Sequence, residues 1–342
     1  MTRIGFAGVG YWGPNLLRNF ENFPDDVTIS AICDSDPKKL ASVKKARPGV
    51  KALSSYGEMI SDEEIDAVVI ALPARLHYEY AKKALERGKD VFVEKPLAMT
   101  EGECRDLIKI SDAKKKIIFV GHTFVYNSAV REVKKYIDGG SLGSVYYIYS
   151  HRLNLGKVRD DVDVMWNLAP HDISIMSYLL GSEPKSVSAR GFYYLRKNIA
   201  DVAFITIEYK NGVSAHIHVS WLDPNKVRRV TIVGSKKMVV YDDVSEDSKI
   251  MIYDRGIDKE HINADLGKYD NYETFLFKHR SGDILIPRIN FEEPLRAEVK
   301  SFVDCVKNRK RPVTDGSSGL EVVKVLEAAS KSLKSGGKVI EL

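Results

Sequence analysis

One lysine stands where the sequence could support acid–base chemistry. Lys95 follows the apolar run 91–93 and Glu94, and it is followed at once by Pro96. Three apolar residues in a row suit a strand buried on both faces, and proline cannot extend such a strand because it has no N–H donor. We therefore expect Lys95 at the carboxyl end of a parallel strand, where open α/β sheets bind ligands. A lysine in a surface turn is the simpler alternative, so the neighbouring elements must decide.

A histidine in the middle of the chain is the second candidate. His171 lies four residues after Asn167, so their side chains can meet on one face of a helix. Asn167 can cap that helix, Pro170 fits its first turn, and Gly181 can end it. The alternative is an ordinary cap and a core histidine.

The amino-terminal residues carry a glycine pattern typical of dinucleotide binding. A strand at 4–7 leads into a loop, and a helical segment begins at Asn15. The loop consists of Gly8, Val9, Gly10, Tyr11, Trp12 and Gly13. The first glycine permits a tight turn, the second lets the backbone approach a pyrophosphate, and the third allows close helix–strand packing.

Asp34 follows the second strand, 27–33, about twenty residues beyond the glycine loop, where an acid can bind ribose hydroxyls. A helix cap is its alternative role, although Ser35 and Asp36 are better placed for that. Its carboxylate would repel a 2′-phosphate, so NAD is preferred over NADP.

Strands and helices alternate through the first ~120 residues. Further strands are expected at 67–72, 91–93 and 117–120, with helices at 56–60 and 77–87. Such alternation predicts a doubly wound parallel sheet. Leu72 and Pro73 would end a strand on the same edge as Lys95, and His77 would either border the cofactor or serve as a packing histidine.

The second half reads as successive strands with few helices, which predicts an antiparallel sheet. The runs are 145–149, 187–193, 202–209, 213–221, 227–233, 238–241 and 250–253. Helices are expected at 294–308 and 319–332. Residues 254–291 show no strong periodicity, and they are open to interpretation as loop, sheet edge or oligomer contact.

Composition indicates a soluble cytoplasmic protein rather than a nucleic-acid or membrane protein. The net charge is only +5, with 52 basic residues mixed among 47 acidic ones, and no apolar run is long enough to span a bilayer. Cys33, Cys104 and Cys305 fit neither a metal site nor a disulfide framework, so we expect no metal. The mild positive excess would suit an anionic small substrate.

Several motifs together resemble the Gfo/Idh/MocA oxidoreductases of sugars and cyclitols. They are the glycine loop, Ala71-Leu72-Pro73 with His77, residues 88–97 around Glu94-Lys95-Pro96, Tyr126-Asn127, residues 140–143, and the segment from Trp166 to Asp172. The resemblance implies a Rossmann domain at 1–122, an α+β substrate and oligomerisation domain at 123–292, and C-terminal helices at 293–342 that pack back on the first domain. The second domain would be a large, open, mainly antiparallel sheet with flanking helices.

The resemblance also implies roles for the candidate residues. NAD would bind the glycine loop, Asp34, the Leu72–His77 segment, Glu94 and Lys95. In relatives, a residue at the position of Asn167 and a histidine at that of His171 lie beside the lysine. His171 would be the base because its ordinary pKa lies near neutrality, with Lys95 stabilising an alkoxide or acting as the base itself. Asn167 stands where relatives often carry an acid, so it would position the substrate.

With asparagine at position 167, the chain resembles one branch of this family. Members of that branch oxidise carbon 3 of UDP-N-acetylhexosamines so that a partner aminotransferase can act on the product. Arg152, Lys157 and Arg159 would lie in a loop and neutralise a diphosphate, or form a solvated basic loop. Tyr126, Asn127 and Trp166 would complete the substrate site. The abundant tyrosines would suit a half-buried sheet face or the interface of a homo-oligomer, either dimer or tetramer. A keto-sugar reductase or an inositol or free-sugar dehydrogenase would use the same residues. A non-enzymatic NAD-responsive regulator is the alternative of another class.

Overall fold

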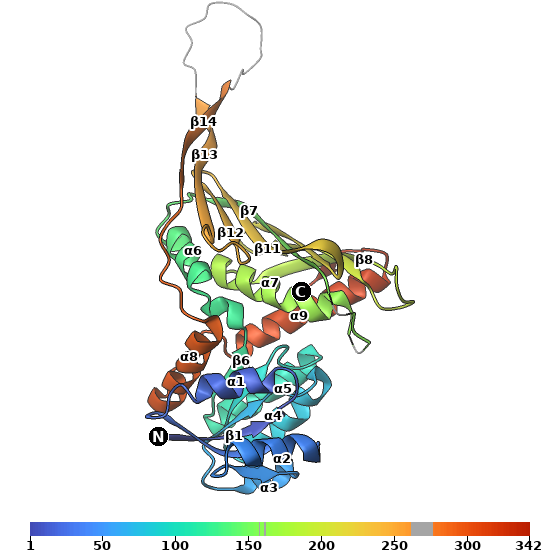
Figure 1. Ribbon diagram of the computed structural model, residues 1–342. Helices are drawn as coiled ribbons and strands as arrows, with labels where there is room; N and C mark the ends of the chain where they lie inside the picture. The colour runs from blue at the N-terminus through green and yellow to red at the C-terminus, as the bar shows by residue number, and fades with distance from the viewer. Residues whose placement is uncertain (157, 161, 261–275) are drawn as a thin grey trace, which may run out of the picture.

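Two sheets organise the chain. The computed structural model describes residues 1–156, 158–160, 162–260 and 276–342 (Figure 1). A six-stranded sheet is formed by the amino-terminal residues, and a nine-stranded sheet is formed by the rest. Figure 1 shows the two sheets at opposite ends of the main body, with helices between them.

The first sheet is wholly parallel, with the order β3-β2-β1-β4-β5-β6. Its strands are β1 (Thr2–Ala7), β2 (Val27–Cys33), β3 (Lys51–Leu53), β4 (Ala67–Ile70), β5 (Asp90–Glu94) and β6 (Ile118–Gly121). Its helices are α1 (Gly13–Phe20), α2 (Pro37–Ala46), α3 (Tyr56–Ser61), α4 (His77–Glu86) and α5 (Glu101–Lys114), and η1 (Ala74–Leu76) is a short 3₁₀ turn. The predicted doubly wound sheet is confirmed, and Lys95 follows directly on a strand whose residues are all buried.

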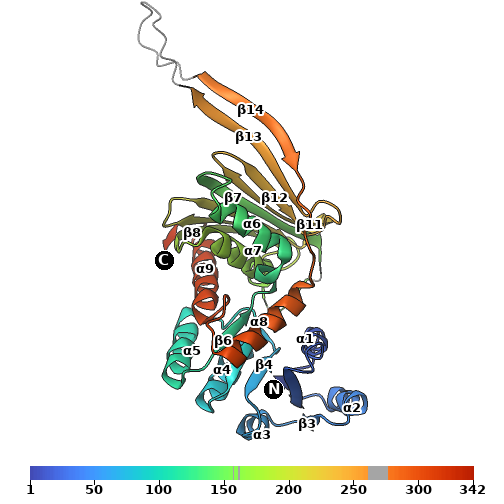
Figure 2. The same ribbon diagram turned by 90° about the vertical axis from the view of Figure 1, so that its left-hand side faces the viewer.

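A helix from the end of the chain completes the core of this first sheet. Phe92 of β5 stacks on Phe119 of β6, with ring centroids 5.1 Å apart, and Phe302 meets both rings edge-on. Phe302 belongs to α8 (Pro294–Asn308), which lies against α1 in Figure 2. Edge-to-face aromatic contacts add to the gain from burying apolar area. The core of the amino-terminal sheet therefore depends on residues about two hundred positions away.

The second sheet is mixed and mostly antiparallel, with the order β14-β13-β12-β11-β7-β10-β9-β8-β15. The strands are β7 (Val145–Leu155), β8 (Pro184–Phe192), β9 (Val202–Tyr209), β10 (Ser214–Ser220), β11 (Leu222–Gly234), β12 (Met238–Asp242), β13 (Ile250–Glu260), β14 (Leu276–Leu285) and β15 (Ile340–Glu341). The predicted large, mainly antiparallel sheet is confirmed, although β10 pairs with β7 in parallel. The parallel pairing arises because the chain leaves β7 through a helix and forms β8 and β9 first. It then places β10 beside β7, on the side of β7 opposite β11.

One face of the second sheet is covered by helices (Figures 1 and 2). They are α6 (Ser128–Asp138), α7 (Val164–Leu180) and α9 (Gly316–Lys334), and the 3₁₀ turn η2 (Thr123–Tyr126) precedes them. The helix expected to begin at Asn167 begins earlier, because the Asp163 carboxylate accepts from the backbone N–H of Trp166 and caps it. Pro170 is therefore inside α7 rather than in its first turn, whereas Gly181 ends the helix with φ +56° as expected.

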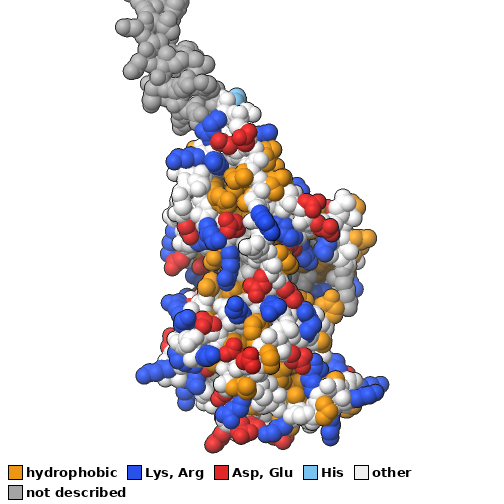
Figure 3. Space-filling model, turned by 60° about the vertical axis from the view of Figure 1, so that its left-hand side comes forward, with side chains coloured by type: hydrophobic (Ala, Val, Ile, Leu, Met, Phe, Trp, Pro, Cys, Tyr) orange, Lys and Arg blue, Asp and Glu red, His pale blue; other side chains and the backbone are white. Residues whose placement is uncertain are grey.

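The segment 254–291, expected as loop, sheet edge or oligomer contact, includes the edge strand β14 of the second sheet, which forms an arm with β13. Strands β13 and β14 pair antiparallel and stand out from the body (Figure 1), while 261–275 lie outside the described residues. Hydrophobic side chains gather over the arm in the face shown in Figure 3, and Lys, Arg, Asp and Glu intermingle below it. Among the described residues, every helix falls short of the length and apolarity that a bilayer crossing needs.

Candidate active site

Lys95 links the parallel sheet to helix α7 of the second domain. It follows β5 at the carboxyl edge of the parallel sheet, and its Nζ donates to the backbone carbonyl oxygen of Asn167 in α7 at 3.0 Å. Asn167 turns its side chain elsewhere, because its Oδ1 accepts from the indole N–H of Trp221 at 3.3 Å. His171 lies one turn further along α7. The three predicted catalytic residues therefore come from two domains and lie close together.

The ring of Phe124 supports the histidine. His171 meets it edge-on, with ring centroids 4.9 Å apart. The guanidinium groups of Arg152 and Arg228 also lie over this ring, 4.5 and 5.7 Å from its centroid. Such cation–π contacts hold a charged group against an apolar surface. They place two permanent cations next to His171.

Burial and these cations keep His171 neutral. Burial lowers the pKa of His171 well below its ordinary value, and the charges of Lys95, Arg152 and Arg228, together with His122, lower it further. A neutral imidazole can accept a proton. The arrangement therefore presents a base that is unprotonated at neutral pH but does not hold a proton tightly.

Glu94 is buried and Lys95 is half-buried, and together they form an acid–base pair. Burial raises the pKa of Glu94, opposed by the charge of Lys95, while burial lowers the pKa of Lys95, opposed by Glu94 and supported by Arg152 and Arg159. The backbone N–H of Lys95 donates to Glu94 Oε2 at 3.2 Å. Both pKa values therefore move toward neutrality, the range in which acid–base groups work best.

The glycine loop fits a dinucleotide. Gly8 has φ +94°, which only glycine adopts readily, and a Cβ on Gly13 would collide with the carbonyl oxygen of Gly8. A Cβ on Gly10 would find only the Lys39 amine, at 4.0 Å, so this backbone is open to a ligand. Tyr11 is 96% exposed and Trp12 39% exposed. The loop thus has the shape that a pyrophosphate needs.

Asp34 ends β2 beside this loop, as expected. Its Oδ2 accepts from the backbone N–H of Val9, and its Oδ1 accepts from that of Asp36, both at 2.9 Å. The Lys39 amine lies 3.6 Å from the same carboxylate. Asp36, not Asp34, caps α2 by accepting from Lys38, so the alternative role of Asp34 as a helix cap is not used.

His77 is a packing residue rather than a cofactor contact. It is 1% exposed, and its ring nitrogens lie 2.7 Å from the carbonyl oxygen of Pro96 and 2.8 Å from that of Leu72. The imidazole therefore fastens the loop after β4 to the loop after β5. Leu72 is half-buried and Pro73 is exposed on this edge, where they can still border a ligand.

Two residues predicted to contact substrate lie in the core. Tyr126 is 1% exposed, stacks on Phe119 and shares a hydrogen bond with Thr314. Asn127 is also 1% exposed, and its carboxamide oxygen caps α6 by accepting from Ala129. Both predictions are wrong because these side chains are consumed by packing and capping.

Trp166 and Arg152 also differ from expectation. The indole N–H of Trp166 donates to Ser330 of α9, so this ring packs between α7 and α9 rather than pointing at a substrate. Arg152 lies in strand β7 rather than in a loop, is 5% exposed, and pairs through its Nε with Asp172 at 2.6 Å. The charge of Arg152 is therefore already balanced by Asp172, the residue after His171. The prediction that Arg152 holds a diphosphate is corrected: Arg152 forms a structural ion pair beside His171.

The remaining two basic residues lie further along the chain. Lys157 is outside the described residues. Arg159 is exposed and close enough to Lys95 for its charge to lower the pKa of that lysine. Of the three predicted anion-binding residues, Arg159 is the one whose position still suits that role.

Two residues near the site were missed. His122 follows β6, is 1% exposed, and has no hydrogen-bond partner for either ring nitrogen. Glu298 of α8 is fully buried and accepts from the Thr123 hydroxyl at 2.8 Å. The rule that identified Lys95, a polar residue directly after a buried parallel strand, could also have identified His122, because His122 directly follows β6. No local pattern marks Glu298.

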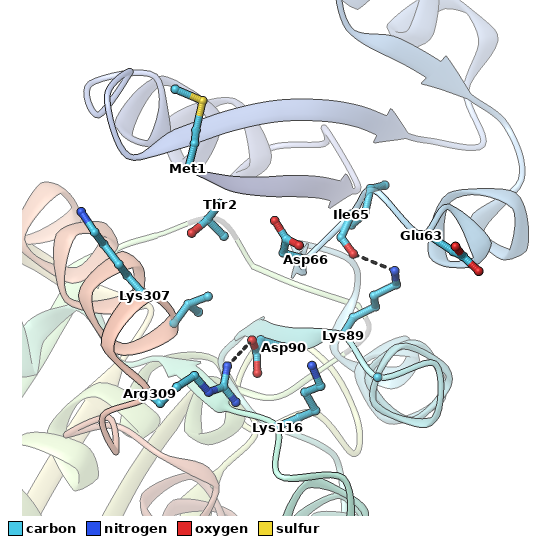
Figure 4. Close-up of a pocket in the computed structure, with 12 residues that line it drawn as sticks. Met1, Thr2, Glu63, Ile65, Asp66, Lys89, Asp90, Lys116, Lys307 and Arg309 are labelled. Carbon is cyan, nitrogen blue, oxygen red and sulfur yellow. Dashed lines mark hydrogen bonds and ion pairs between the residues drawn. The ribbon is translucent and has the colours of Figure 1, made fainter.

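A cavity of about 480 Å³ lies at the opposite, amino edge of the parallel sheet (Figure 4). Its lining includes Met1, Lys89, Asp90, Lys116 and Arg309. Parallel α/β sheets bind ligands at the carboxyl edge, so this hollow is not the active site. Within the described part of the chain, no cluster of His, Cys, Asp and Glu is suited to a metal ion.

Both domains match one oxidoreductase family. Residues 2–122 match GFO_IDH_MocA, described as an oxidoreductase family with an NAD-binding Rossmann fold, and residues 130–240 match the GFO/IDH/MocA C-terminal domain. Together the two matches cover more than half of the chain.

Individual relatives are distant. An uncharacterised oxidoreductase of Streptococcus pneumoniae is 27% identical over 62% of this chain and 60% of its own length, so the matched stretch spans less than two thirds of that relative. The myo-inositol 2-dehydrogenase of Thermotoga maritima is 24% identical over 97% of this chain and 96% of its own.

Solved structures share the fold over nearly the whole chain. The WlbA dehydrogenase of Bordetella pertussis, in complex with NADH and UDP-GlcNAcA, has a TM-score of 0.79 at 23% identity, covering 100% of this chain and 98% of its own. The UDP-N-acetylglucosamine 3-dehydrogenase GnnA of Acidithiobacillus ferrooxidans has a TM-score of 0.78 at 22% identity, covering 97% and 98%. This chain belongs to the Gfo/Idh/MocA family of NAD-binding oxidoreductases.

Proposed function

We propose that the protein is an NAD-dependent dehydrogenase that oxidises a secondary alcohol of a sugar. The observation that carries this is the contact between Lys95, at the carboxyl edge of the NAD-binding domain, and the backbone of Asn167, one turn before a neutral His171. A cation and a base thus lie together at the edge where the cofactor binds.

The glycine loop and Asp34 would hold the cofactor. The open backbone at Gly10 suits the pyrophosphate, and the Asp34 carboxylate suits the adenosine ribose hydroxyls and disfavours a 2′-phosphate. Leu72, Pro73 and Glu94 would border its nicotinamide half. When bound, NAD supplies the acceptor for the hydride. Every other part of the reaction falls to side chains of the protein.

His171 acts as the base for the substrate hydroxyl. It is neutral, so it can accept the proton, and the adjacent cations disfavour the imidazolium that results. Lys95 stabilises the negative charge that develops on the same oxygen. Asn167, whose side chain lies beside Trp221, positions the sugar by hydrogen bonding.

The substrate is proposed to be a UDP-N-acetylhexosamine oxidised at carbon 3, whose keto product a partner aminotransferase would then aminate. Support comes from the shared fold of WlbA and GnnA, whose names state UDP-sugar ligands or substrates. In this chain Arg159, with Lys157, would meet the diphosphate. An Arg159→Ala variant should raise KM for the nucleotide sugar and leave kcat near native, and an unchanged KM would remove this role.

Inositol is the second candidate substrate, favoured by the full-length match to the myo-inositol 2-dehydrogenase. A mass-spectrometric screen of UDP-sugars, dTDP-sugars, free sugars and inositols with NAD decides between them. Running the reverse reaction on the keto products tests the reductase alternative.

Large apolar side chains are exposed on the second sheet and on the arm. The outer face of the second sheet exposes Tyr147, Phe192 and Phe204, and the arm exposes Ile257 and Ile284, so we propose a homo-oligomer of the cytoplasmic enzyme that covers them. Light scattering of the purified protein measures its mass, and a monomer at micromolar concentration would contradict this assembly.

Lys95→Ala and His171→Ala test the enzyme assignment itself. Each should lower turnover of the best substrate by about a hundredfold or more. If both variants kept full turnover, the catalytic roles would be wrong and the regulator alternative would gain ground. NAD that copurifies with the protein would locate the cofactor independently.

A further inference from the structure

Arg228 of β11 is a charged side chain beside His171 that has no part in the proposed hydride transfer. It is the cross-strand partner of Arg152 in β7, so the two side chains stand next to each other on one face of the second sheet. That face is the one covered by α7, because Arg152 pairs with Asp172 of that helix. Both guanidinium groups lie over the ring of Phe124, which His171 meets edge-on. Arg228 therefore faces the candidate active site from the strand beside β7.

The two arginines differ in how many of their N–H groups are used. The side chain of Arg152 is 6% exposed and donates through both Nε and Nη2 to Asp172. The side chain of Arg228 is 37% exposed, and only its Nη1 donates to Asp243, at 3.2 Å. A guanidinium has five N–H donors in a planar fork, and within the described residues the remaining donors of Arg228 have no protein acceptor. Arg228 thus keeps N–H groups available for a ligand.

Asp243 holds Arg228 in this position. Its second oxygen, Oδ1, accepts from the Tyr241 hydroxyl at 3.0 Å and from the Asn127 carboxamide at 3.3 Å. The side chain of Asp243 is only 17% exposed, so these donors fix a carboxylate that is largely withdrawn from solvent. The fixed carboxylate in turn limits the orientation of the arginine. A guanidinium oriented in this way loses little conformational freedom when it binds an anion.

Arg228 and Arg159 lie on opposite sides of strand β7. The backbone carbonyl oxygen of Arg159 accepts from Arg196, which lies between β8 and β9. In the sheet order β11-β7-β10-β9-β8, those two strands are on one side of β7 and β11 is on the other. Beyond the effect of burial, the charge of Arg159 lowers the pKa of Lys95, and the charge of Arg228 lowers the pKa of His171. The two cations therefore flank the reacting position.

A nucleotide sugar can present an anion to each of these cations. Carbon 1, which carries the diphosphate, and carbon 5, which carries carbon 6, lie on opposite sides of the line from carbon 3 to the ring oxygen. We propose that Arg228 is a substrate-binding residue that holds a carboxylate at carbon 6, so that the substrate is a nucleotide-linked hexuronic acid. This rests on the proposed dehydrogenase function and its preference for carbon 3. Arginine suits a carboxylate because its parallel N–H groups can bond both oxygens.

Two nucleotide sugars that differ only at carbon 6 test the proposal. The probes are UDP-N-acetylglucosamine and UDP-N-acetylglucosaminuronic acid, each assayed with NAD. The native kcat/KM should be about ten- to a hundredfold higher for the acid, because only the acid gains charge-assisted hydrogen bonds from Arg228. Arg228→Gln should remove this preference, mainly by raising KM for the acid, and leave the neutral sugar near native. Arg228→Lys should keep part of the preference, because lysine retains the charge but not the planar fork.

Arg229 provides the matched control. It is the next residue of β11, points to the other face of the sheet, and pairs with Asp242 at 2.7 Å with a side chain that is 48% exposed. Arg229→Gln should keep the native preference, and an equal loss there would overturn the proposal. Equal kcat/KM values for the two sugars in the native protein, or an unchanged preference in Arg228→Gln, would overturn it as well. If Arg228→Gln does not fold, Arg228→Lys carries the test, and a full native preference in that variant contradicts the proposal.

Calorimetric titration of the protein loaded with NADH separates the two anions of the substrate. Arg228→Gln should weaken binding of the acidic sugar about tenfold or more and leave binding of UDP native, whereas Arg159→Ala should weaken binding of UDP. If Arg228→Gln weakened binding of UDP as strongly as that of the acidic sugar, the guanidinium would hold a phosphate and the proposal would be wrong. Failure of the native protein to bind the acidic sugar would also overturn it. If the native protein bound this sugar but reduced no NAD with any sugar or cyclitol, the proposed dehydrogenase function would fail instead, and the titration would still show whether Arg228 selects a carboxylate.

Discussion

Strand β5 has a lysine at each end, Lys89 buried and Lys95 half-buried, and the two lysines have different surroundings. Lys89, just before the strand, donates to the carbonyl oxygen of Ile65 at 2.6 Å (Figure 4). It also donates to the carbonyl oxygen of Asp62 at 2.7 Å. Lys95, just after it, donates to one carbonyl oxygen in the other domain and lies among buried polar atoms without partners. Burial lowers the pKa of both. The amino edge of the sheet is thus a satisfied structural region, while the carboxyl edge keeps its polar groups available.

Replacing the two lysines separately should give opposite results, and this is the largest effect we expect. Lys95→Met should lower turnover about a thousandfold with little loss of stability, because the amine acts on the reacting oxygen. Lys89→Met should keep turnover near native and lower the free energy of unfolding by about 1–3 kcal/mol, because two buried carbonyls lose their partner. Steady-state kinetics and urea unfolding of both variants measure this. Equal losses of turnover would show that the two ends do not differ in function.

Breaking the buried ion pair between Asp172 and Arg152, beside His171, should cause the largest loss of stability. Asp172→Asn leaves the buried guanidinium of Arg152 without its countercharge, which typically costs about 3–5 kcal/mol. At the amino edge, Asp90→Asn should cost less, about 1–3 kcal/mol, because its partner Arg309 is 48% exposed and can turn to solvent. The comparison uses urea midpoints at constant m-value. A larger loss of unfolding free energy in Asp90→Asn than in Asp172→Asn would contradict this expectation.

The buried acid Glu298 should make the carboxyl edge sensitive to pH. Its pKa is raised in the folded state, so its contribution to stability is full below its unfolded pKa and decreases as pH rises toward the folded value. Glu298→Gln cannot ionise, so between about pH 5 and about pH 8 the variant should lose less stability than the native protein. Unfolding free energies at the two pH values test this. Parallel losses in both proteins would mean that Glu298 ionises as freely as an exposed acid.

An exposed ion pair at the amino edge should contribute least to stability. Lys307 lies 2.8 Å from Asp26, with the two side chains 61% and 39% exposed. Lys307→Ala should change the unfolding free energy by about 0–1 kcal/mol and leave turnover native. A loss comparable with that of Asp172→Asn would mean that exposure does not decide the strength of these pairs.

The sequence was most informative where local chemistry dictates structure. The position of Lys95 followed from a buried run stopped by proline, and the turn at Gly8 followed from a glycine that must adopt positive φ. Such rules depend on near neighbours in the chain, so a single sequence contains them.

The errors fall where contacts distant in sequence decide. Tyr126 is buried because Thr314 and Phe119 contact it, and the charge of Arg152 in β7 is neutralised by Asp172 of α7. The capping residue of α7 was misplaced because both Asp163 and Asn167 can cap a helix, and packing selected the earlier one. Glu298 approaches the site only because α8 folds back, which no periodicity reveals.

That return of α8 has a consequence for synthesis on the ribosome. Its Phe302 completes the aromatic core of the amino-terminal sheet, and its Glu298 reaches the candidate active site. The amino-terminal sheet is translated first, yet it cannot bury Phe92 and Phe119 fully until about two hundred further residues have emerged. The nascent protein therefore exposes an unfinished apolar surface while those residues are made, a state that chaperones recognise. Translation products that stop before α8 lack both Phe302 and Glu298, so they should complete neither the aromatic core nor this side of the candidate site.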